Sequence, residues 1–221
     1  MDFQKVKAVV FDLDGTLLDT IRDIGTGVNT ALCRYHCPEI PLEKYRDLVG
    51  HGSRRLIDLA VPGGEKNEKL DEILQYYVRY YREHCTVHTD YFPGIREMLR
   101  SLQAGGYRLA VISNKTERTA QKIIGHYFPE IHFDFVWGNN NVRPLKPAID
   151  AGRAACEELK LKPEEIFYFG DGDTDMEFGS RMGFLTVGCD WGYRSPAQLR
   201  EAGAQKIVSK PSEVLALLGL N

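Results

Sequence analysis

The segment VVFDLDGTLLDT, residues 9–20, joins a strand-like run to a cluster of acids. The apolar residues before Asp12 suit a buried strand, but three aspartates, Asp12, Asp14 and Asp19, then surround a Gly-Thr pair. A lone buried carboxylate costs several kcal/mol unless a cation or hydrogen bonds compensate it. The segment is therefore either a strand that runs out into an ordinary turn, or a site whose acids bind a partner from outside the chain.

The composition of the whole chain limits the possible partners. With 221 residues, of which 43% are hydrophobic and 27% charged, the chain can bury a core and form one or two domains. Its formal net charge of −3, with both signs mixed, lacks the basic excess that nucleic acids or anionic membranes attract. We therefore expect no nucleic-acid or membrane partner. For the oligomeric state, we expect either a monomer or a homodimer.

The expected compartment follows from the N-terminus and the cysteines. The chain reaches a strand almost at once, without the apolar core of a signal peptide, and no segment is long and apolar enough to span a bilayer. Five scattered cysteines include no CxxC pair, which predicts reduced thiols. These features predict a cytoplasmic protein.

Short β-rich runs alternate with helical stretches along most of the chain. The predicted strands are short and apolar, and they span residues 6–11, 108–113, 133–137, 166–170, 185–187 and, more weakly, 205–208. The predicted helices between or after them span residues 93–104, 117–127, 147–159, 174–182 and 211–218. This alternation predicts an α/β fold with a doubly wound parallel sheet covered on both faces.

One long segment breaks the alternation. From about Thr20 to His88 the sequence has helical patterning and no convincing strand. We interpret this segment as a small helical domain inserted after the first strand. The predicted boundaries are residues 17–89 for the helical domain, and residues 1–16 and 90–221 for the α/β core domain.

Chemically unusual residues stand where four predicted strands end. They are Asp12 to Thr16 after the first strand, Ser113 to Lys115 at the second, Lys146 past the third, and Gly170 to Asp175 after the fourth. Because the carboxyl ends of parallel strands share one edge of a sheet, these groups should converge there. Asp12 and Asp14, two positions apart, can face the same side.

This set of side chains suits phosphoryl transfer with magnesium. Mg²⁺ takes oxygen ligands, commonly one or two carboxylates with phosphate and water, and would cancel the charge of the buried acids. Asp12 could attack phosphorus as a carboxylate nucleophile, and Asp14 could supply and remove protons. Ser113 could bind phosphate oxygens, and Lys146 could offset the negative charge.

These motifs also resemble a known family. DLDGT at residues 12–16, Ser113, Lys146 and GDGDTD at residues 170–175 resemble, in order, the four motifs of the haloacid-dehalogenase-like hydrolase superfamily. The resemblance extends from Val6 to about Val187. The helical insertion resembles the α-helical cap of the phosphoglycolate phosphatase-like branch, which implies a Rossmann-like core with that cap.

The resemblance implies a role for each matching residue. It implies that Asp12 is the nucleophile and Asp14 the acid/base, and that Mg²⁺ is held by Asp12, the Asp14 carbonyl and Asp171. Asp175 would support the metal site, and the phosphate and leaving group would meet Thr16, Ser113, Asn114 and Lys146.

The fourth motif departs from the common pattern, since Gly172 replaces a frequent Ser or Thr and Asp173 adds an acid. Which of Asp171, Asp173 and Asp175 contacts the metal therefore stays open. We favour Asp171, which is closest to the strand end. Asp173 fits the start of a helix at least as well as a metal site.

A glycine-flanked loop in the helical insertion resembles the loop that such phosphatases lower over the leaving group. It reads Gly50-His51-Gly52-Ser53-Arg54-Arg55. His51, Gly52 and Arg55 are the predicted substrate contacts, with Arg54 a further candidate. The alternative is a helix start at Ser53, followed by solvated arginines.

These observations favour a Mg²⁺-dependent phosphatase acting on a small phosphomonoester through an aspartyl-phosphate, with 2-phosphoglycolate as the best single guess. A β-phosphoglucomutase-like sugar phosphomutase or a pyrophosphatase of the same superfamily stays open. A dehalogenase is disfavoured because halide leaving groups need no acid such as Asp14. A non-enzymatic phospho-receiver domain is disfavoured because it would be shorter and would lack the helical insertion.

Overall fold

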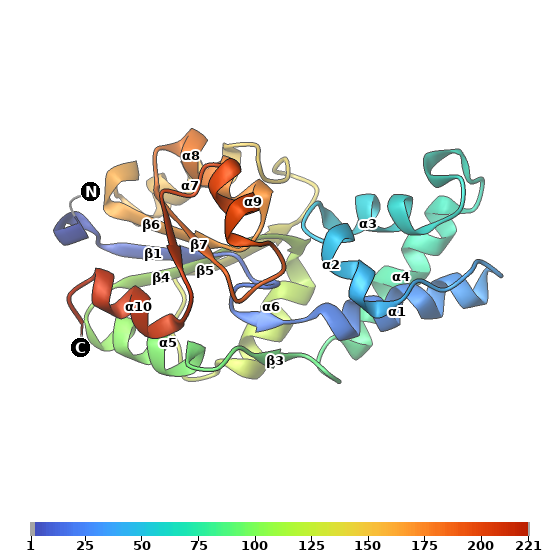
Figure 1. Ribbon diagram of the computed structural model, residues 1–221, viewed down its shortest axis with the longest axis horizontal. Coiled ribbons are helices and arrows are strands. Elements are labelled where there is room, and N and C mark those ends of the chain that lie inside the picture. The colour runs from blue at the N-terminus through green and yellow to red at the C-terminus, as the bar shows by residue number, and fades with distance from the viewer. Residues whose placement is uncertain (1–2, 221) are drawn as a thin grey trace.

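A six-stranded sheet forms one half of the molecule and a group of helices the other half (Figure 1). The structure, a computed structural model, describes residues 3–220. The strands are β1 (Ala8–Phe11), β4 (Arg108–Thr116), β5 (Phe135–Asn139), β6 (Ile166–Gly170), β7 (Leu185–Cys189) and β8 (Lys206–Val208). Their order is β5-β4-β1-β6-β7-β8, and every neighbouring pair is parallel, which confirms the predicted α/β sheet.

The first strand of this sheet lies at its centre. Val10 of β1 pairs with Ala110 of β4 on one side and with Tyr168 of β6 on the other. All four residues of β1 are buried, as expected for a parallel strand covered on both faces. The carboxyl end of β1, where Asp12 follows, is therefore flanked by the ends of β4 and β6.

Helices cover both faces of the sheet, and the side chains of β1 alternate between them. Val9 and Phe11 belong to one buried cluster, and Ala8 and Val10 to another. The first cluster includes residues of α5 (Ile95–Ala104), α6 (Glu117–Tyr127) and α10 (Pro211–Leu217), and the second those of α7 (Asp150–Leu159) and α8 (Asp173–Met182). This arrangement is the predicted doubly wound architecture.

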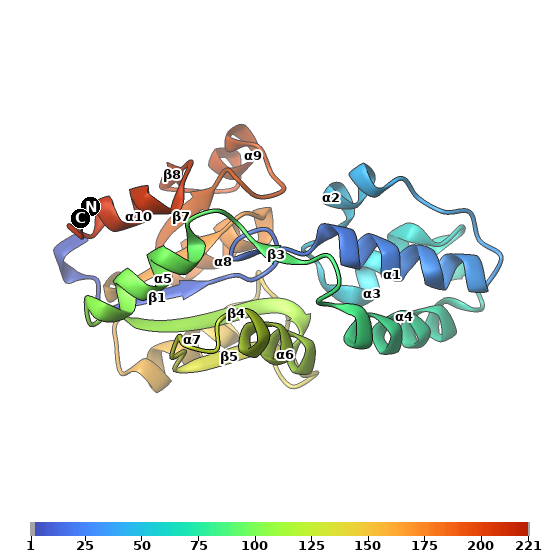
Figure 2. The same cartoon turned by 90° about the horizontal axis from the view of Figure 1, so that it is seen from below.

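The inserted segment is helical, as predicted, and lies beside the sheet (Figure 2). Its helices are α1 (Ile21–Arg34), α2 (Tyr45–Leu48), α3 (Gly52–Ala60) and α4 (Leu70–His84), with 3₁₀ turns at Leu42–Lys44 and Gly64–Lys66. The buried stripe of α1 includes Ile24, Val28 and Leu32, at the spacing of one helix face.

A two-stranded antiparallel sheet joins the two halves. Its strands are β2 (Leu18–Asp19), where the chain enters the helical segment, and β3 (Asp90–Tyr91), where the chain leaves it. Because this sheet marks both crossings, we retain the proposed boundaries of residues 17–89 for the helical domain and residues 1–16 and 90–221 for the core. Residues 1, 2 and 221, which we assign to the core, lie outside the described residues.

Several predicted element ends need correction. β1 begins at Ala8 rather than residue 6, because a 3₁₀ turn at Phe3–Lys5 precedes it. β4 continues past residue 113 to Thr116, with an irregular register after Ile112. A short helix, α9 (Pro196–Glu201), was not predicted; its main sequence signal is the Ser195-Pro196 start.

Within residues 3–220, no helix has both the length and the apolarity needed to cross a membrane, and all five cysteines are unpaired.

Candidate active site

A cavity lies between the carboxyl edge of the sheet and the helical domain. Asp12, Asp14 and Lys115 line it from the core, and Leu56 and Tyr81 line it from helices α3 and α4. The charged side chains of the lining thus come from the core, which we call the core wall, and its aliphatic side chains from the helical domain, which we call the helical wall.

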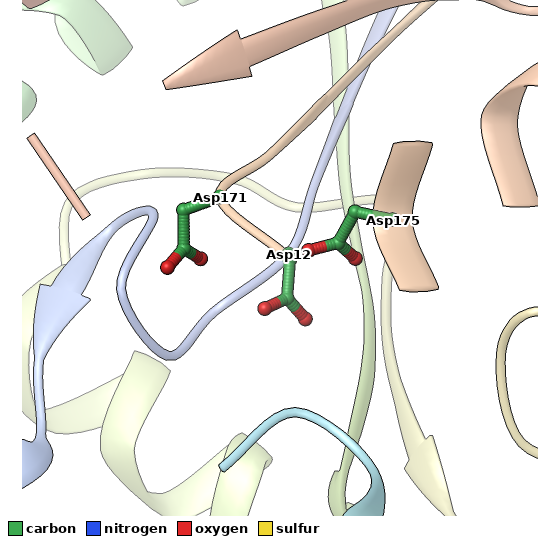
Figure 3. A group of neighbouring side chains, drawn as sticks. All are labelled: Asp12, Asp171 and Asp175. Carbon is green, nitrogen blue, oxygen red and sulfur yellow. The ribbon is translucent and has the colours of Figure 1, made fainter. Parts of the chain in front are cut away.

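Three buried carboxylates meet at the floor of this cavity (Figure 3). Asp12 follows β1, Asp171 follows β6, and Asp175 reaches in from helix α8. One oxygen from each lies within 4.8 Å of the other two. The structure therefore brings together acids that are up to 163 positions apart, the separation of 12 and 175.

Lys146 lies among these acids and is itself buried. Its Nζ donates to Asp12 Oδ1 at 2.8 Å, to Asp175 Oδ1 at 2.6 Å, to the Ile112 carbonyl at 2.9 Å and to the Tyr168 hydroxyl at 2.8 Å. This network uses Oδ1 of Asp12 and leaves Oδ2 with no hydrogen-bond donor from any residue between 3 and 220.

Asp171 is held from the opposite side. The Thr16 hydroxyl donates to its Oδ1 at 3.0 Å, and the Tyr193 backbone N–H donates to its Oδ2 at 2.9 Å. Gly15 has a φ of +81°, and a Cβ there would lie 2.1 Å from Asp171 Oδ2. Glycine at position 15 thus permits both the left-handed turn and the close approach of the carboxylate.

The crowding of acids perturbs their proton affinities. Burial, followed by the charges of Asp175 and Asp14, raises the pKa of Asp12 to about 6 against the opposing effect of Lys146. Burial and the charges of Asp175 and Asp12 raise the pKa of Asp171 well above its ordinary value. Burial alone would lower the pKa of Lys146, but the charges of Asp12 and Asp175 outweigh it and raise this pKa. The site therefore holds more negative charge than its lysine balances.

Asp14 faces the same cavity but has separate partners. Lys115 Nζ donates to its two carboxylate oxygens at 2.7 and 2.9 Å, and the Thr20 hydroxyl donates to Oδ1 at 2.6 Å. The Thr20 backbone N–H in turn donates to the Tyr193 hydroxyl at 3.0 Å. These contacts therefore fix the position of the Asp14 side chain at the boundary between the two walls.

The predicted phosphate contacts Ser113 and Asn114 both line the cavity. The Ser113 hydroxyl accepts a hydrogen bond from the Lys115 backbone N–H at 3.3 Å and can still donate one. The Asn114 amide is already used: it donates to the carbonyls of Gly50 and Lys146 at 2.9 and 3.0 Å, and it accepts from the Lys146 N–H at 2.8 Å. Asn114 thus ties the Gly50 loop to the Lys146 loop.

The predicted contacts from the helical domain separate into two groups. Gly52 lines the cavity, with Leu145 so near that a Cβ would lie 2.9 Å from its Cδ1. His51 and Arg55 are not among the cavity-lining residues: His51 lies 3.6 Å from exposed Asp173, and Arg55 pairs with Asp58 one turn along its own helix. Arg54 likewise pairs with Asp71 on the surface, at 2.7 Å.

The donor set of the cluster fits a magnesium ion. Three carboxylates within 4.8 Å of one another, opposed by one lysine, leave a net negative charge that a divalent cation balances. Of the three acids in the fourth motif, Asp171 and Asp175 belong to this cluster, whereas the side chain of Asp173 is half exposed. Both Asp175 oxygens already accept hydrogen bonds, from Lys146, Tyr168 and the Gly172 N–H.

Comparison with known proteins identifies the family. The family model for haloacid dehalogenase-like hydrolases matches residues 9–189. The chain belongs to this family. The predicted family resemblance is thereby confirmed, and the match covers all four motifs quoted from the sequence.

Individual relatives within this family span nearly the whole chain. A phosphoglycolate phosphatase of Nitrosospira multiformis is 30% identical, over 96% of each chain. An N-acetylmuramic acid 6-phosphate phosphatase of Pseudomonas aeruginosa is 28% identical, over 99% of this chain and 97% of that protein. The crystal structure of a predicted phosphoglycolate phosphatase from Haemophilus somnus matches with a TM-score of 0.88 at 26% identity, over 96% of this chain and 98% of that one.

Sequence reasoning missed two residues of the site, Tyr193 and Tyr81, and placed Lys115 at the edge of the sheet without giving it a role. The position of Lys115 two residues after Ser113 could have suggested one, because a strand presents such positions on the same side. Tyr193 follows the carboxyl end of β7, but it lies in a segment without a motif. Tyr81 belongs to a tyrosine-rich helix, which the sequence indicates only as helix packing.

Proposed function

We propose that the chain is a Mg²⁺-dependent phosphatase that hydrolyses a small phosphomonoester through an aspartyl-phosphate on Asp12. The observation that supports this most strongly is the buried cluster of Asp12, Asp171 and Asp175 around Lys146. Buried like charges are unfavourable unless a ligand compensates them, so a cluster of this kind is a candidate for function.

The first step uses the oxygen of Asp12 that has no donor. Oδ2 attacks phosphorus, and the bond between phosphorus and the leaving oxygen breaks. Lys146 holds Oδ1, which fixes the orientation of the carboxylate and reduces its repulsion of the phosphoryl oxygens. The Ser113 hydroxyl, on the same cavity wall, binds a phosphoryl oxygen.

Proton transfer falls to Asp14. Its carboxyl group gives a proton to the leaving oxygen as that bond breaks, and the resulting carboxylate then takes a proton from water. The water oxygen attacks phosphorus, the bond to Asp12 breaks, and inorganic phosphate leaves. Both acids return to their starting states.

Magnesium, held by Asp12, the Asp14 carbonyl and Asp171, would supply charge neutralisation at the phosphoryl group. Asp175 supports this site through Lys146 and the Gly172 N–H. Thr16 and the Tyr193 N–H fix the orientation of Asp171 before any ion binds.

The substrate proposed is 2-phosphoglycolate. Helices α3 and α4 cover the site, which favours small esters over phosphorylated proteins. Several relatives, including that of Nitrosospira multiformis, are named phosphoglycolate phosphatases. A cytoplasmic location stays a prediction from the sequence.

The test is phosphate release from a panel of esters with Mg²⁺, ranked by kcat/KM. The panel contains 2-phosphoglycolate, pyrophosphate, nucleotides, hexose phosphates and N-acetylmuramic acid 6-phosphate. We expect 2-phosphoglycolate to rank first, EDTA to abolish release and added Mg²⁺ to restore it. Full turnover in EDTA would contradict the metal assignment, and no turnover of any ester with Mg²⁺ would refute the function.

A further inference from the structure

Lys115 is a buried cation whose side-chain partners all lie in the cavity. Its side chain is 6% exposed, and its Nζ bonds both oxygens of Asp14 and lies 4.6 Å from the centre of the Tyr81 ring. It is held by one carboxylate and an aromatic face, at the point where the two walls of the cavity meet.

The other two cations that line this cavity are committed elsewhere. Lys146 makes four hydrogen bonds beneath the carboxylate cluster. The guanidinium of Arg194 donates to the backbone carbonyls of Arg46 and Val49 in the helical domain. Of the cavity-lining cations among residues 3–220, Lys115 is the one placed beside the proposed acid, and its ammonium, with two bonds to Asp14, keeps a third N–H for a leaving group.

Tyr81 provides a second, independent observation. The residue lines the cavity, is 5% exposed, and its hydroxyl has no hydrogen-bond partner within the described part of the chain. A buried hydroxyl without a partner is unfavourable by about 1–3 kcal/mol, so it marks a place where a ligand oxygen would be stabilised. The rest of the lining from the helical domain includes the aliphatic side chains of Leu56 and Val78 and the hydroxyl-bearing side chains of Ser53 and Tyr77.

We propose that Lys115 and the Tyr81 hydroxyl bind a carboxylate on the carbon next to the leaving oxygen, which selects phosphorylated 2-hydroxy acids as the substrate class. This inference rests on the proposed phosphatase function. It assigns leaving-group recognition to strand β4 and helix α4, rather than to the His51 and Arg55 loop.

The spacing of the groups supports a carboxylate at that position. Lys115 Nζ lies 2.7 Å from Asp14 Oδ1, and a proton-donating Asp14 must lie about 2.7 Å from the leaving oxygen. The leaving oxygen is then at most about 5.5 Å from Nζ, the sum of two such contacts. A carboxylate on the adjacent carbon has an oxygen about 3 Å from the leaving oxygen, so a carboxylate turned toward Lys115 comes within hydrogen-bond reach of Nζ.

The test compares two esters of similar size, 2-phosphoglycolate and 2-hydroxyethyl phosphate, with Mg²⁺. We expect the wild type to favour the carboxylate ester at least about tenfold in kcat/KM, and Lys115→Gln to reduce this preference about tenfold to hundredfold, the worth of a charge-assisted hydrogen bond. Lys115→Arg should restore part of the preference. Tyr81→Phe should reduce it about threefold to tenfold.

The matched control is Tyr80→Phe, since Tyr80 stacks on His84 of the same helix and does not line the cavity; its preference should equal that of the wild type. If Lys115 only positions Asp14, Lys115→Gln lowers kcat equally for both esters, and that result overturns the inference. Hydrolysis of both esters by the wild type without preference also overturns it and leaves the phosphatase function standing. Failure to hydrolyse either ester, with turnover of another ester of the panel, would also overturn the inference, whereas no turnover of any ester would refute that function.

A measurement on the wild type covers the case in which Lys115→Gln does not fold. Glycolate, the expected product, should inhibit at least about tenfold more strongly than ethylene glycol, because only glycolate carries the carboxylate. Equal inhibition would contradict carboxylate recognition.

Discussion

The two walls of the cavity differ in how completely their polar groups are satisfied. On the core wall, Lys146 makes four hydrogen bonds and Asp171 accepts two, so each side chain has a fixed position. On the helical wall, the buried Tyr81 hydroxyl has no partner among residues 3–220, and the aliphatic side chains of Leu56 and Val78 line the same cavity.

This difference separates two tasks. A densely bonded, charged wall is organised before any ligand binds, which suits chemistry common to all phosphate esters. A wall of aliphatic and hydroxyl-bearing side chains, with the Tyr81 hydroxyl buried and unpartnered among residues 3–220, gains polar contacts from a fitting leaving group. We expect changes on the core wall to affect every ester alike, and changes on the helical wall to affect some esters more than others.

The largest effect is expected from Asp12→Asn on the core wall. Asparagine can still accept a hydrogen bond from Lys146, so the fold should be retained, but an amide is a poor nucleophile. We expect kcat to fall by about 10⁴-fold or more for every ester, measured as phosphate release beside thermal unfolding.

The matched control is Asp173→Asn, which removes an acid of the same motif whose side chain is half exposed and lies outside the cluster. Its kcat should stay within about threefold of the wild type. Turnover above about 1% in Asp12→Asn would show that another group performs the attack.

A smaller effect is expected from Gly15→Ala, which disturbs the core wall without removing a functional group. The new Cβ would lie 2.1 Å from Asp171 Oδ2, so that carboxylate must move. Since a displacement of about 1 Å at a catalytic group can cost about 10²-fold, we expect a loss of that size for all esters in steady-state assays.

Gly106→Ala separates this displacement from backbone strain. Gly106 has nearly the same φ, +80°, but a Cβ there would meet nothing within 4 Å. Both variants should lose about 1 kcal/mol of stability to backbone strain, and Gly15→Ala should lose more because of the clash; only Gly15→Ala should lose activity. Equal activity in the two variants would argue against a tightly defined position for Asp171.

The core wall was largely predictable because its signals are local and additive. Asp12, Ser113 and Asp171 each stand at or just beyond the end of an apolar run, and parallel strands bring such ends to one edge, whereas Lys146 lies seven positions after the end of β5. The strand and helix periods also yielded β6 and α6 with their observed bounds. The family's ordered motifs connected positions that no local pattern could connect.

The helical wall could not be predicted in the same way. Whether Tyr77, Tyr80 or Tyr81 faces the cavity depends on the rotation of α4 against α1, which tertiary packing sets. The positions of His51 and Arg55 outside the cavity were not predicted either. Each of these side chains pairs with a carboxylate outside the cavity, His51 with Asp173 and Arg55 with Asp58. The ion pair between Lys115 and Asp14 likewise joins two residues that are 101 positions apart in the sequence, and no local pattern predicts such a pair.

The smallest effect on catalysis is expected where the two walls are joined. Asp23 on α1 is buried, and its carboxylate accepts hydrogen bonds from the backbone N–H groups of Val87, His88 and Thr89 at 2.9–3.0 Å, as well as from the Thr89 hydroxyl at 2.9 Å. These hydrogen bonds hold residues 87–89, which lead from α4 back to β3, against helix α1. Asp23 therefore stabilises the connection between the helical domain and the core.

Asp23→Asn replaces one acceptor oxygen with a donor that faces backbone N–H groups, so at least one of these hydrogen bonds is lost. We expect the free energy of unfolding to fall by about 1–3 kcal/mol and amide exchange at residues 87–89 to accelerate, with kcat changing only a few fold. Asp90→Asn is the control, because Asp90 is exposed and bonds only the N–H of its neighbour Tyr91. If both variants have the free energy of unfolding of the wild type, the Asp23 hydrogen bonds do not stabilise the connection between the helical domain and the core. That connection would then depend on the pairing of β2 with β3.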